Sequence, residues 1–263
     1  MDLKGLKFSK MHGIGNDFVI IDESKATQIP ETDKPEACRF LCDRHFGVGA
    51  DGVLFVVTSN VADIGYRMFN PDGSEAEMCG NGIRCAAQFL KDYKYSLDNY
   101  IDILTMDGMK HIDYIQNEIK VHMGNITNTK MTHKIIDCDN QQCQLYLCHM
   151  GVNHVIYNTE HFYNVYSLSK TICKSLNEEM NINFVLRMNS KRLKVRTYEK
   201  GAGLTLACGT GACASVIIYY YLGLCENCVD VEMLGGTLRI EIIDNELYMY
   251  GNAHKICEGE YNE

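Results

Sequence analysis

A sequence motif occurs twice in this chain of 263 residues, and this repeat constrains the fold more than any other feature. The first copy centres on Cys79 and reads R-M-F-N-P-D-G-S-E-A-E-M-C-G-N-G. The second copy centres on Cys208 and reads R-T-Y-E-K-G-A-G-L-T-L-A-C-G-T-G. The cysteines are 129 residues apart (208 − 79), close to half of the chain. The repeat predicts two similar halves, with one cysteine from each half facing the other across a cleft.

Composition and charge restrict the class of protein. The chain is 46% hydrophobic and 22% charged, as is usual for a globular protein, and it is long enough for two domains. No apolar run approaches the roughly 18 residues of a membrane span, and residues 1–5 lack a signal-peptide core. We therefore expect a cytoplasmic protein without a membrane partner. The net charge of −9, without a basic cluster, also argues against a nucleic-acid partner.

Thirteen cysteines are present, and a reducing compartment makes a disulfide framework improbable for so long a chain. Most of these cysteines are expected to pack as small hydrophobic residues. Cys225 and Cys228 form a lone C-x-x-C without a second pair of zinc ligands nearby, so packing is also expected for them. The sequence predicts no metal site.

The apolar patterning predicts the same succession of elements in both halves. Expected strands are at 8–12, 18–22, 53–58, 64–70, 100–105, 109–115, 118–123, 144–149, 155–157, 183–188, 193–198, 237–243, 246–250 and 254–257. Expected helices are at 33–45, 80–93, 167–177 and 209–222. The polar stretch 124–132 marks a boundary between domains 1–124 and 125–252, and the segment 253–263 is expected to return to the first domain. The fold class is α/β (α+β), with two pseudo-symmetric domains, each a curled, mostly antiparallel sheet around a central helix.

Each cysteine of the repeat precedes G-x-G at the predicted start of a helix. Glycine lets the backbone turn tightly and approach a ligand. The first N–H groups of a helix have no acceptor within it, and the helix dipole favours negative charge there. We therefore expect a carboxylate on the amides of Gly80 and Asn81 and on those of Gly209 and Thr210. The same position favours the thiolate form of a cysteine.

These two features together predict inversion of an amino acid at Cα. An α-carboxylate held between two helix ends places its Cα between the two sulfurs. The Cα–H group is a very weak acid, so the developing carbanion needs focused positive potential in a dry site. One sulfur must be a thiolate and the other a thiol, so the pair titrates as a unit. No cofactor is required.

A simpler interpretation makes both cysteines buried caps and gives the glycines only a turn-forming role. A single C-G-x-G would favour that interpretation. Two copies at half-length spacing, each after an arginine and an aromatic residue at a strand end, argue against it. A ligand-binding or redox-sensing protein with the same fold is a third, non-enzymatic possibility.

Four segments of the chain resemble the diaminopimelate epimerase family. They read K-M-H-G-I-G-N-D-F at 10–18, F-G-V-G-A-D-G at 46–52, C-G-N-G-I-R-C at 79–85 and A-C-G-T-G-A at 207–212. They span nearly the whole chain in the order of the family. The resemblance implies a cofactor-independent enzyme that interconverts LL- and meso-diaminopimelate, a precursor of lysine and peptidoglycan. It also implies two pseudo-symmetric domains and a homodimer.

The resemblance assigns roles to individual residues. Cys79 and Cys208 match the acid–base pair, and His154 and Glu199 match residues that assist the thiols. The positions that match substrate contacts are Asn16, Asn70, Gly80, Asn81, Asn181, Lys200, Gly209 and Thr210.

The chain departs from the family pattern at the distal, non-reacting end of the substrate. The G-N-P-H of the family reads G-V-N-H here, so Val152 replaces an asparagine. Lys200 replaces an arginine, which keeps the charge but loses the bidentate fork. In the G-E-T that follows, Leu204 replaces the acidic residue. A racemase of another amino acid, such as histidine, is therefore the alternative to diaminopimelate epimerase.

Overall fold

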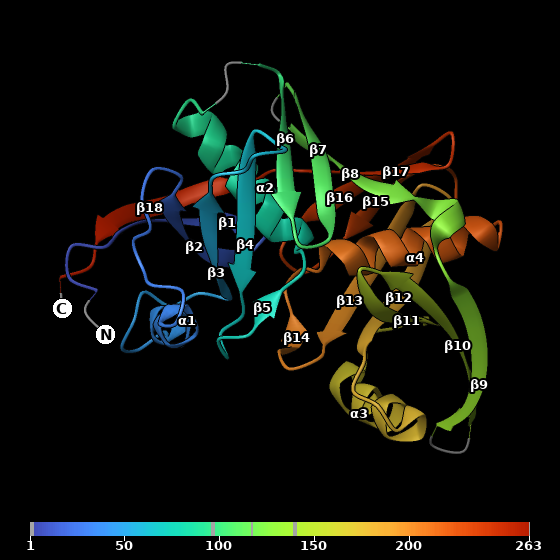
Figure 1. Cartoon of the computed structure of the whole chain (residues 1–263). Coiled ribbons are helices and arrows are strands. Elements are labelled where there is room, and N and C mark those ends of the chain that lie inside the picture. Colours follow the sequence, from blue (N-terminus) through green and yellow to red (C-terminus); the bar gives the residue numbers. More distant parts are fainter. Residues whose placement is uncertain (1–2, 96–97, 117, 139–140, 263) are drawn as a thin grey trace. The chain divides into compact units, whose positions relative to one another are not determined.

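The computed structural model describes residues 3–95, 98–116, 118–138 and 141–262 (Figure 1). The chain divides into two compact units. Unit 1 comprises Met1–Val121 together with Gly251–Glu263, and unit 2 comprises His122–Tyr250. The sequence placed the corresponding divisions after residues 124 and 252.

Unit 1 is built on a mixed sheet. Its elements are β1 (Lys7–Gly13), β2 (Asn16–Glu23), α1 (Lys34–Cys42), β3 (Gly52–Val57), β4 (Ile64–Phe69), β5 (Glu75–Ala76), α2 (Gly80–Asp92), β6 (Tyr100–Thr105), β7 (Gly108–Ile115), the first part of β8 (Glu118–Asn125), and β18 (His254–Glu260). Strand β1 pairs antiparallel with both β2 and β18. The pairs β2–β3 and β4–β6 are parallel, and the pairs β3–β4, β4–β5, β6–β7 and β7–β8 are antiparallel.

Unit 2 repeats this plan. Its elements are η1 (Ile126–Asn128), β9 (Met131–Cys138), β10 (Gln141–Met150), β11 (Val152–Asn158), α3 (Val165–Leu176), β12 (Asn181–Asn189), β13 (Arg192–Glu199), β14 (Gly203–Thr205), α4 (Gly209–Tyr221), β15 (Cys228–Glu232), β16 (Thr237–Ile243) and β17 (Glu246–Gly251). The pairs β11–β12 and β13–β15 are parallel, and the pairs β9–β10, β10–β11, β12–β13, β13–β14, β15–β16 and β16–β17 are antiparallel.

The repeat extends to the register of the strands. In unit 1, Phe18 on β2 lies opposite Gly52 on β3, and in unit 2, His154 on β11 lies opposite Asn181 on β12. Two residues further along, Leu54 on β3 pairs with Met68 on β4, and Asn183 on β12 pairs with Thr197 on β13. The positions of Phe18, Leu54 and Met68 in unit 1 therefore correspond to those of His154, Asn183 and Thr197 in unit 2. The predicted fold class, with two pseudo-symmetric halves, is confirmed.

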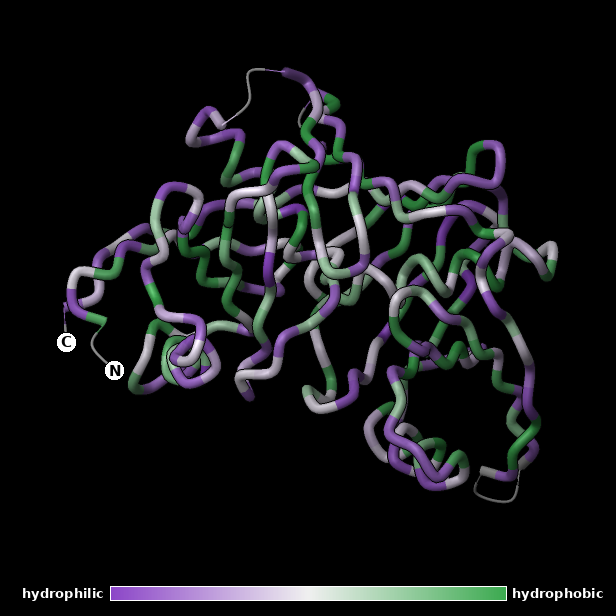
Figure 2. Tube along the Cα trace, in the orientation of Figure 1, coloured by the Kyte–Doolittle hydropathy of each residue, from purple (hydrophilic) through white to green (hydrophobic). Residues whose placement is uncertain are grey.

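A helix that follows a repeat cysteine packs on the sheet of each unit (Figure 1). Helix α2 packs against β1 to β4, and helix α4 packs against β10, β11, β12 and β16. Nearly the whole of α4 is buried, including Val216, Ile217 and Tyr219. Hydrophobic and hydrophilic residues alternate along several strands, among them β6, β8 and β16, as expected when one face of a strand meets the core (Figure 2). Within the described ranges, no helix is long and apolar enough to cross a membrane.

The structure differs from the sequence predictions at several elements. Strands β5, β9, β14 and β15 were not predicted. The helix predicted for 33–45 ends at Cys42, because the carboxylate of Asp43 accepts the N–H groups of His45 and Phe46 and turns the chain. Asp33 occupies the N-cap position as predicted, but its side chain makes no capping hydrogen bond.

Candidate active site

The backbone places the two repeat cysteines in the same conformation. Each is the N-cap residue of its helix, with φ −130° and ψ 121° at Cys79 and φ −136° and ψ 111° at Cys208. Each Sγ accepts a hydrogen bond at 3.4 Å from the third helical N–H, which belongs to Gly82 or to Gly211. Both sulfurs therefore occupy the position of a capping oxygen, where backbone N–H groups and the helix dipole favour negative charge.

The four residues predicted to bind a carboxylate take the first two positions of the helices. Gly80 and Asn81 begin α2, and Gly209 and Thr210 begin α4. The N–H groups at these positions of any α-helix have no acceptor within the helix. Each helix start thus combines an anion-binding backbone with a sulfur on the adjacent residue.

In unit 1, Asn16 and Asn81 surround the thiol of Cys79. The Nδ2 of Asn81 donates to Asn16 Oδ1 at 3.1 Å, and the same oxygen accepts from Cys79 Sγ at 3.9 Å. The Nδ2 of Asn16 donates to Asp51 Oδ2 at 2.8 Å, which fixes the amide so that its carbonyl points toward the sulfur. Cys79 Sγ therefore meets a side-chain acceptor, the Asn16 carbonyl, in addition to the backbone donor of Gly82.

Arg84 contacts this cluster through hydrogen bonds and was not predicted from the sequence as a site residue. Its guanidinium is fully buried. It donates to the carbonyl oxygen of Gly80 at 2.9 Å and to Asn81 Oδ1 at 2.8 Å. Because Oδ1 of Asn81 faces the arginine, its Nδ2 must face Asn16.

An ion-pair network holds Asp51. Arg44 bridges Asp51 at 2.8 Å and Asp17 at 2.7 Å, and Lys10 pairs with Asp17 at 2.9 Å. Burial opposes the ionisation of Asp17, but hydrogen bonds from Arg44 and Lys10 outweigh it and lower the pKa of Asp17 to about 2. The network holds the loop between α1 and β3, which carries Arg44 and Asp51, against β1 and β2.

Asn70 lies apart from the Cys79 cluster. Its Nδ2 donates to Ser74 Oγ at 3.0 Å across the turn between β4 and β5. The structure therefore does not bring Asn70 into hydrogen-bond contact with the predicted residues around Cys79.

In unit 2, a different set of partners surrounds Cys208. The Oγ1 of Thr210 lies 3.6 Å from Cys208 Sγ, and Nε2 of His154 lies 3.0 Å from the same Oγ1. His154 is fully buried. Burial first, and then the charge of His149, lower the pKa of His154 to about 3, so the imidazole is neutral at physiological pH.

Two further residues complete the environment of His154 and were missed in the sequence. The Nδ2 of Asn183 lies 3.1 Å from His154 Nδ1, and the hydroxyl of Thr197 donates to Asn183 Oδ1 at 3.0 Å. Both residues are buried. No local motif marks them, because β11, β12 and β13 become neighbours only in the folded sheet.

The remaining predicted residues of unit 2 lie at the ends of its strands. Glu199 accepts a hydrogen bond from the hydroxyl of Thr205. The side chain of Asn181 accepts from the backbone N–H of Lys200 at 3.0 Å and donates to the carbonyl oxygen of Asn153 at 3.2 Å. Lys200 is exposed, and Val152 is 44% exposed. Asn181 thus links the two segments that carry the departures from the family pattern.

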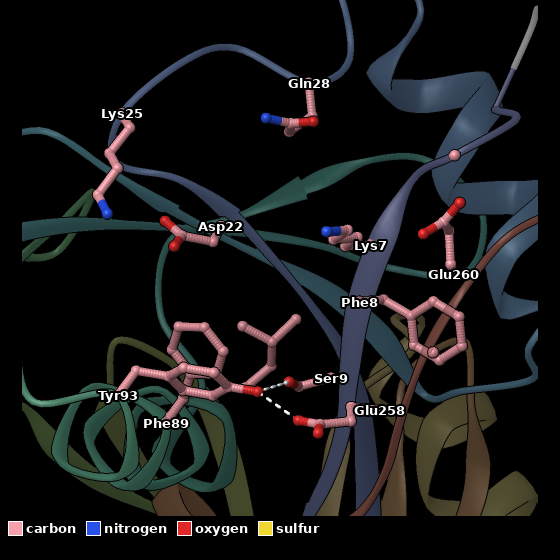
Figure 3. Close-up of a pocket in the computed structure, with 13 residues that line it drawn as sticks. Lys7, Phe8, Ser9, Asp22, Lys25, Gln28, Phe89, Tyr93, Glu258 and Glu260 are labelled. Carbon is pink, nitrogen blue, oxygen red and sulfur yellow. Dashed lines mark hydrogen bonds between the residues drawn. The ribbon is translucent and has the colours of Figure 1, made fainter.

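Other candidate sites are distinct from these clusters. A cavity of about 750 Å³ lies in unit 1, lined by residues of β1, β2, β18 and the end of α2 (Figure 3). Tyr93 there donates to Glu258 at 2.5 Å and contacts Ser9 at 3.1 Å. The residues that line this cavity include none of the predicted site residues. In the described part of the chain, no group of three or more His, Cys, Asp or Glu residues is arranged to hold a metal ion.

Cys225 and Cys228 lie between α4 and β15 and at the first residue of β15. Burial raises the pKa of Cys225 to about 11 and also raises the pKa of Cys228. Both groups are therefore protonated thiols at neutral pH, which agrees with a packing role.

Comparison with known proteins gives a consistent result. The family model described as diaminopimelate epimerase matches residues 8–129 and 147–256. A diaminopimelate epimerase from Archaeoglobus fulgidus is 37% identical over 269 residues, covering 97% of this chain and 95% of the relative. One from Methanococcus maripaludis is 38% identical over 279 residues, covering 97% and 99%. Among solved structures, a PhzF-family phenazine biosynthesis protein from Enterococcus faecalis has a TM-score of 0.76 at 15% identity, covering 97% of this chain and 98% of that one, which shows a shared fold.

Proposed function

The chain belongs to the diaminopimelate epimerase family, and on this premise we propose that it interconverts LL- and meso-diaminopimelate by a two-thiol mechanism. The chain is an isomerase of the epimerase type. The observation that carries the mechanism is the matched position of the two sulfurs, each a helix N-cap that accepts the third helical N–H at 3.4 Å.

The reaction moves one proton off Cα and another onto it. The thiolate takes the Cα proton and becomes a thiol, while the other thiol gives its proton to the opposite face of the carbanion and becomes a thiolate. The substrate leaves with inverted configuration, and the two sulfurs have exchanged protonation states. The first amides of α2 and α4 bind the α-carboxylate, and the ends of both helices stabilise the charge that develops on it.

The side chains around each sulfur adjust its protonation. Asn16 and Asn81 hold an amide carbonyl toward Cys79, and His154 acts on Cys208 through Thr210. Glu199, which is fixed by Thr205, acts as the second residue that assists the thiols.

The distal end of the substrate is assigned to Asn70, Asn181 and Lys200. The amide of Asn181 orders the backbone of Lys200, so the lysine ammonium is presented from a fixed point on the chain. An ammonium at this place pairs with the distal carboxylate as a point charge, without the fork of an arginine. The exposed side chain of Val152 contributes only an apolar contact. The chain is therefore proposed to act on diaminopimelate while binding its distal carboxylate more weakly than the arginine and asparagine of the family pattern would.

The direct test is exchange of the Cα proton. Reduced enzyme is incubated with LL-diaminopimelate in D2O, and deuterium incorporation and meso product are followed by NMR. We expect incorporation at the inverted centre. Failure of LL-diaminopimelate to exchange with an enzyme that exchanges L-histidine or another L-amino acid from a panel would reject the substrate.

Assembly and location are proposed on separate grounds. We propose a homodimer, as the family resemblance implies, and the exposed strand β18 offers seven residues as a template for pairing with another chain. The cytoplasm is the proposed compartment, because the chemistry needs both thiols reduced. Light scattering after size exclusion tests the dimer, and a monomer at micromolar concentration that is fully active would reject it.

A further inference from the structure

We infer that Asn183 is a positioning residue that fixes the tautomer of His154 and so makes Thr210 a hydrogen-bond donor to Cys208. This inference rests on the proposed role of Cys208 as an acid–base thiol. It concerns a continuous chain of four contacts, two of them fully buried, that ends at the sulfur.

The orientation of the Asn183 amide is decided by a backbone carbonyl. Nδ2 lies 3.3 Å from the carbonyl oxygen of Val155, which can only accept a hydrogen bond. The flipped amide would place Oδ1 against that oxygen. In the orientation observed, Oδ1 accepts from the hydroxyl of Thr197 at 3.0 Å. The two hydrogens on Nδ2 then each point to an acceptor, one to the carbonyl oxygen of Val155 and the other to His154.

The second hydrogen of Nδ2 determines the state of the imidazole. It points to Nδ1 of His154 at 3.1 Å, so Nδ1 must be the bare, accepting nitrogen. The ring proton of a neutral histidine then lies on Nε2 and is donated to Thr210 Oγ1 at 3.0 Å. The low pKa of His154 removes the doubly protonated form at working pH, so the neutral ring is the one that acts.

The threonine passes this polarity to the sulfur. Since Oγ1 of Thr210 already accepts from His154, its own hydrogen is directed at Cys208 Sγ, 3.6 Å away. Every contact from Thr197 to Cys208 then points the same way, and the last one stabilises a thiolate. His154 works here as a neutral donor and takes no proton from substrate.

Close packing keeps Asn183 in place. A Cβ atom on Gly211 would lie 2.2 Å from Asn183 Oδ1, so the amide sits directly under the first turn of α4. Asn183, His154 and Thr197 are each no more than 1% exposed. Water therefore cannot substitute for a missing donor without rearrangement of the core.

The first test reads the tautomer in the wild-type chain. Long-range ¹H–¹⁵N NMR of the full-length reduced protein reports which ring nitrogen carries the proton, and a His154→Gln variant assigns the signals. We expect the Nε2–H tautomer. A wild-type His154 with its proton on Nδ1 would overturn the inference without any variant or any turnover.

The second test reverses the polarity. Asn183→Asp replaces the donor with an acceptor. At a pH above the imidazolium pKa, which the new carboxylate raises, this acceptor draws the single ring proton to Nδ1 and turns Thr210 away from the sulfur. We expect alkylation of Cys208 by iodoacetamide, followed by peptide mass spectrometry at fixed pH, to slow by about tenfold, the value of one hydrogen bond to a charged group. The rate at Cys79 in the same molecules should not change.

A matched variant separates positioning from packing. Asn183→Leu installs the residue found at the corresponding place in unit 1, Leu54, and removes the donor without adding an acceptor. We expect a mixed tautomer and an intermediate Cys208 alkylation rate. Equal slowing of Cys79 and Cys208 would show a general loss of structure, and an unchanged Cys208 rate in both variants would overturn the inference. Neither the NMR measurement nor the alkylation rate uses substrate. These tests can therefore fail or succeed independently of the proposed epimerase activity.

Discussion

The surroundings of Cys79 and Cys208 share a backbone and differ in the residues beneath it. Both sulfurs cap a 13-residue helix through an N–H···S contact of 3.4 Å. At the three corresponding sheet positions, unit 1 has Phe18, Leu54 and Met68, whereas unit 2 has His154, Asn183 and Thr197. Below α2 these positions form an apolar core, and below α4 they form a hydrogen-bonded chain.

This difference shows how one fold can give two thiols different properties. The helix start supplies the same backbone donor to both sulfurs. The neighbouring side chains then make opposite hydrogen bonds to the two sulfurs. The amide carbonyl of Asn16 accepts from Cys79, and in our inference the hydroxyl of Thr210 donates to Cys208. An acceptor favours a thiol and a donor favours a thiolate, which are the two states that the reaction needs at the same moment.

The strongest challenge to the comparison is removal of either thiol. Cys79→Ala and Cys208→Ala should each reduce epimerisation by about 10³-fold or more, because general acid–base catalysis is lost on one face of Cα. The remaining thiol can still take and return a proton on its own face. We expect each variant to exchange deuterium into one epimer without inversion, and the two variants to act on opposite epimers.

Retention of full turnover by either variant would show that its thiol is not in the proton path. Exchange into the same epimer by both variants would show that the two thiols do not act on opposite faces.

The next test introduces polarity into unit 1. Leu54→Asn places an amide between the side chains of Phe18 and Met68. These apolar side chains cannot form the hydrogen bonds that His154 and Thr197 make with Asn183 in unit 2. We expect a loss of about 2–4 kcal/mol in the free energy of unfolding, measured by urea denaturation, because a buried polar group lacks a partner and core volume is lost. Leu54→Met is the size-conserving control and should cost less than about 1.5 kcal/mol. Equal stability of the two variants would contradict the contrast between the apolar residues below α2 and the hydrogen-bonded residues below α4.

Acid stability sharpens the comparison on the side of unit 2. Burial lowers the pKa of His154 in the folded chain to about 3, from its ordinary value of 6.5. Between these values the unfolded chain binds a proton that the folded chain does not, so this residue makes stability fall as the pH falls from 6.5 toward 3. From pH 6.5 to pH 5 the loss is about 1.6 kcal/mol.

His154→Gln should flatten this part of the curve of unfolding free energy against pH, as measured by chemical denaturation at each pH. A slope identical to that of the wild type would mean that His154 is protonated in the folded state.

The smallest effect is expected at Asn16. Asn16→Ala removes the carbonyl that accepts from Cys79, so the thiolate of Cys79 becomes easier to form. Alkylation of Cys79 should accelerate about threefold, as expected for the loss of one weak hydrogen bond, while Cys208 keeps its rate. This change in alkylation rate is opposite in direction to the slowing expected at Cys208 in Asn183→Asp. Slower alkylation of Cys79 in Asn16→Ala would contradict the proposal that Cys79 faces an acceptor and Cys208 a donor.

The sequence alone predicted the helix starts at Gly80 and Gly209, because a repeated cysteine followed by glycines is a strong local signal. It did not predict β5 or β14, since two or three residues show no alternation. Asn183 was placed in a strand, but its role depends on Val155 and Thr197, which lie on two other strands. Local patterns identify an element and its buried face, whereas a hydrogen-bond chain across three strands depends on register.

Arg84 illustrates the same limit within one helix. The C-G-N-G-I-R-C segment drew attention to its cysteine and glycines, and the arginine lies one turn further along α2, fully buried. Its contacts with Gly80 and Asn81 follow from helical spacing, but a charged residue is expected on the surface unless a structure shows its partners.

The pairing of β18 with β1 has a consequence for the order in which the chain folds during synthesis. Unit 2 is continuous in sequence, so all of its strands are available once Tyr250 has been made. Unit 1 begins first but has to wait for β18 before β1 gains its second neighbour. We therefore expect the half that contains Cys208 to have all of its strands synthesised before the half that contains Cys79, although Cys79 is translated first.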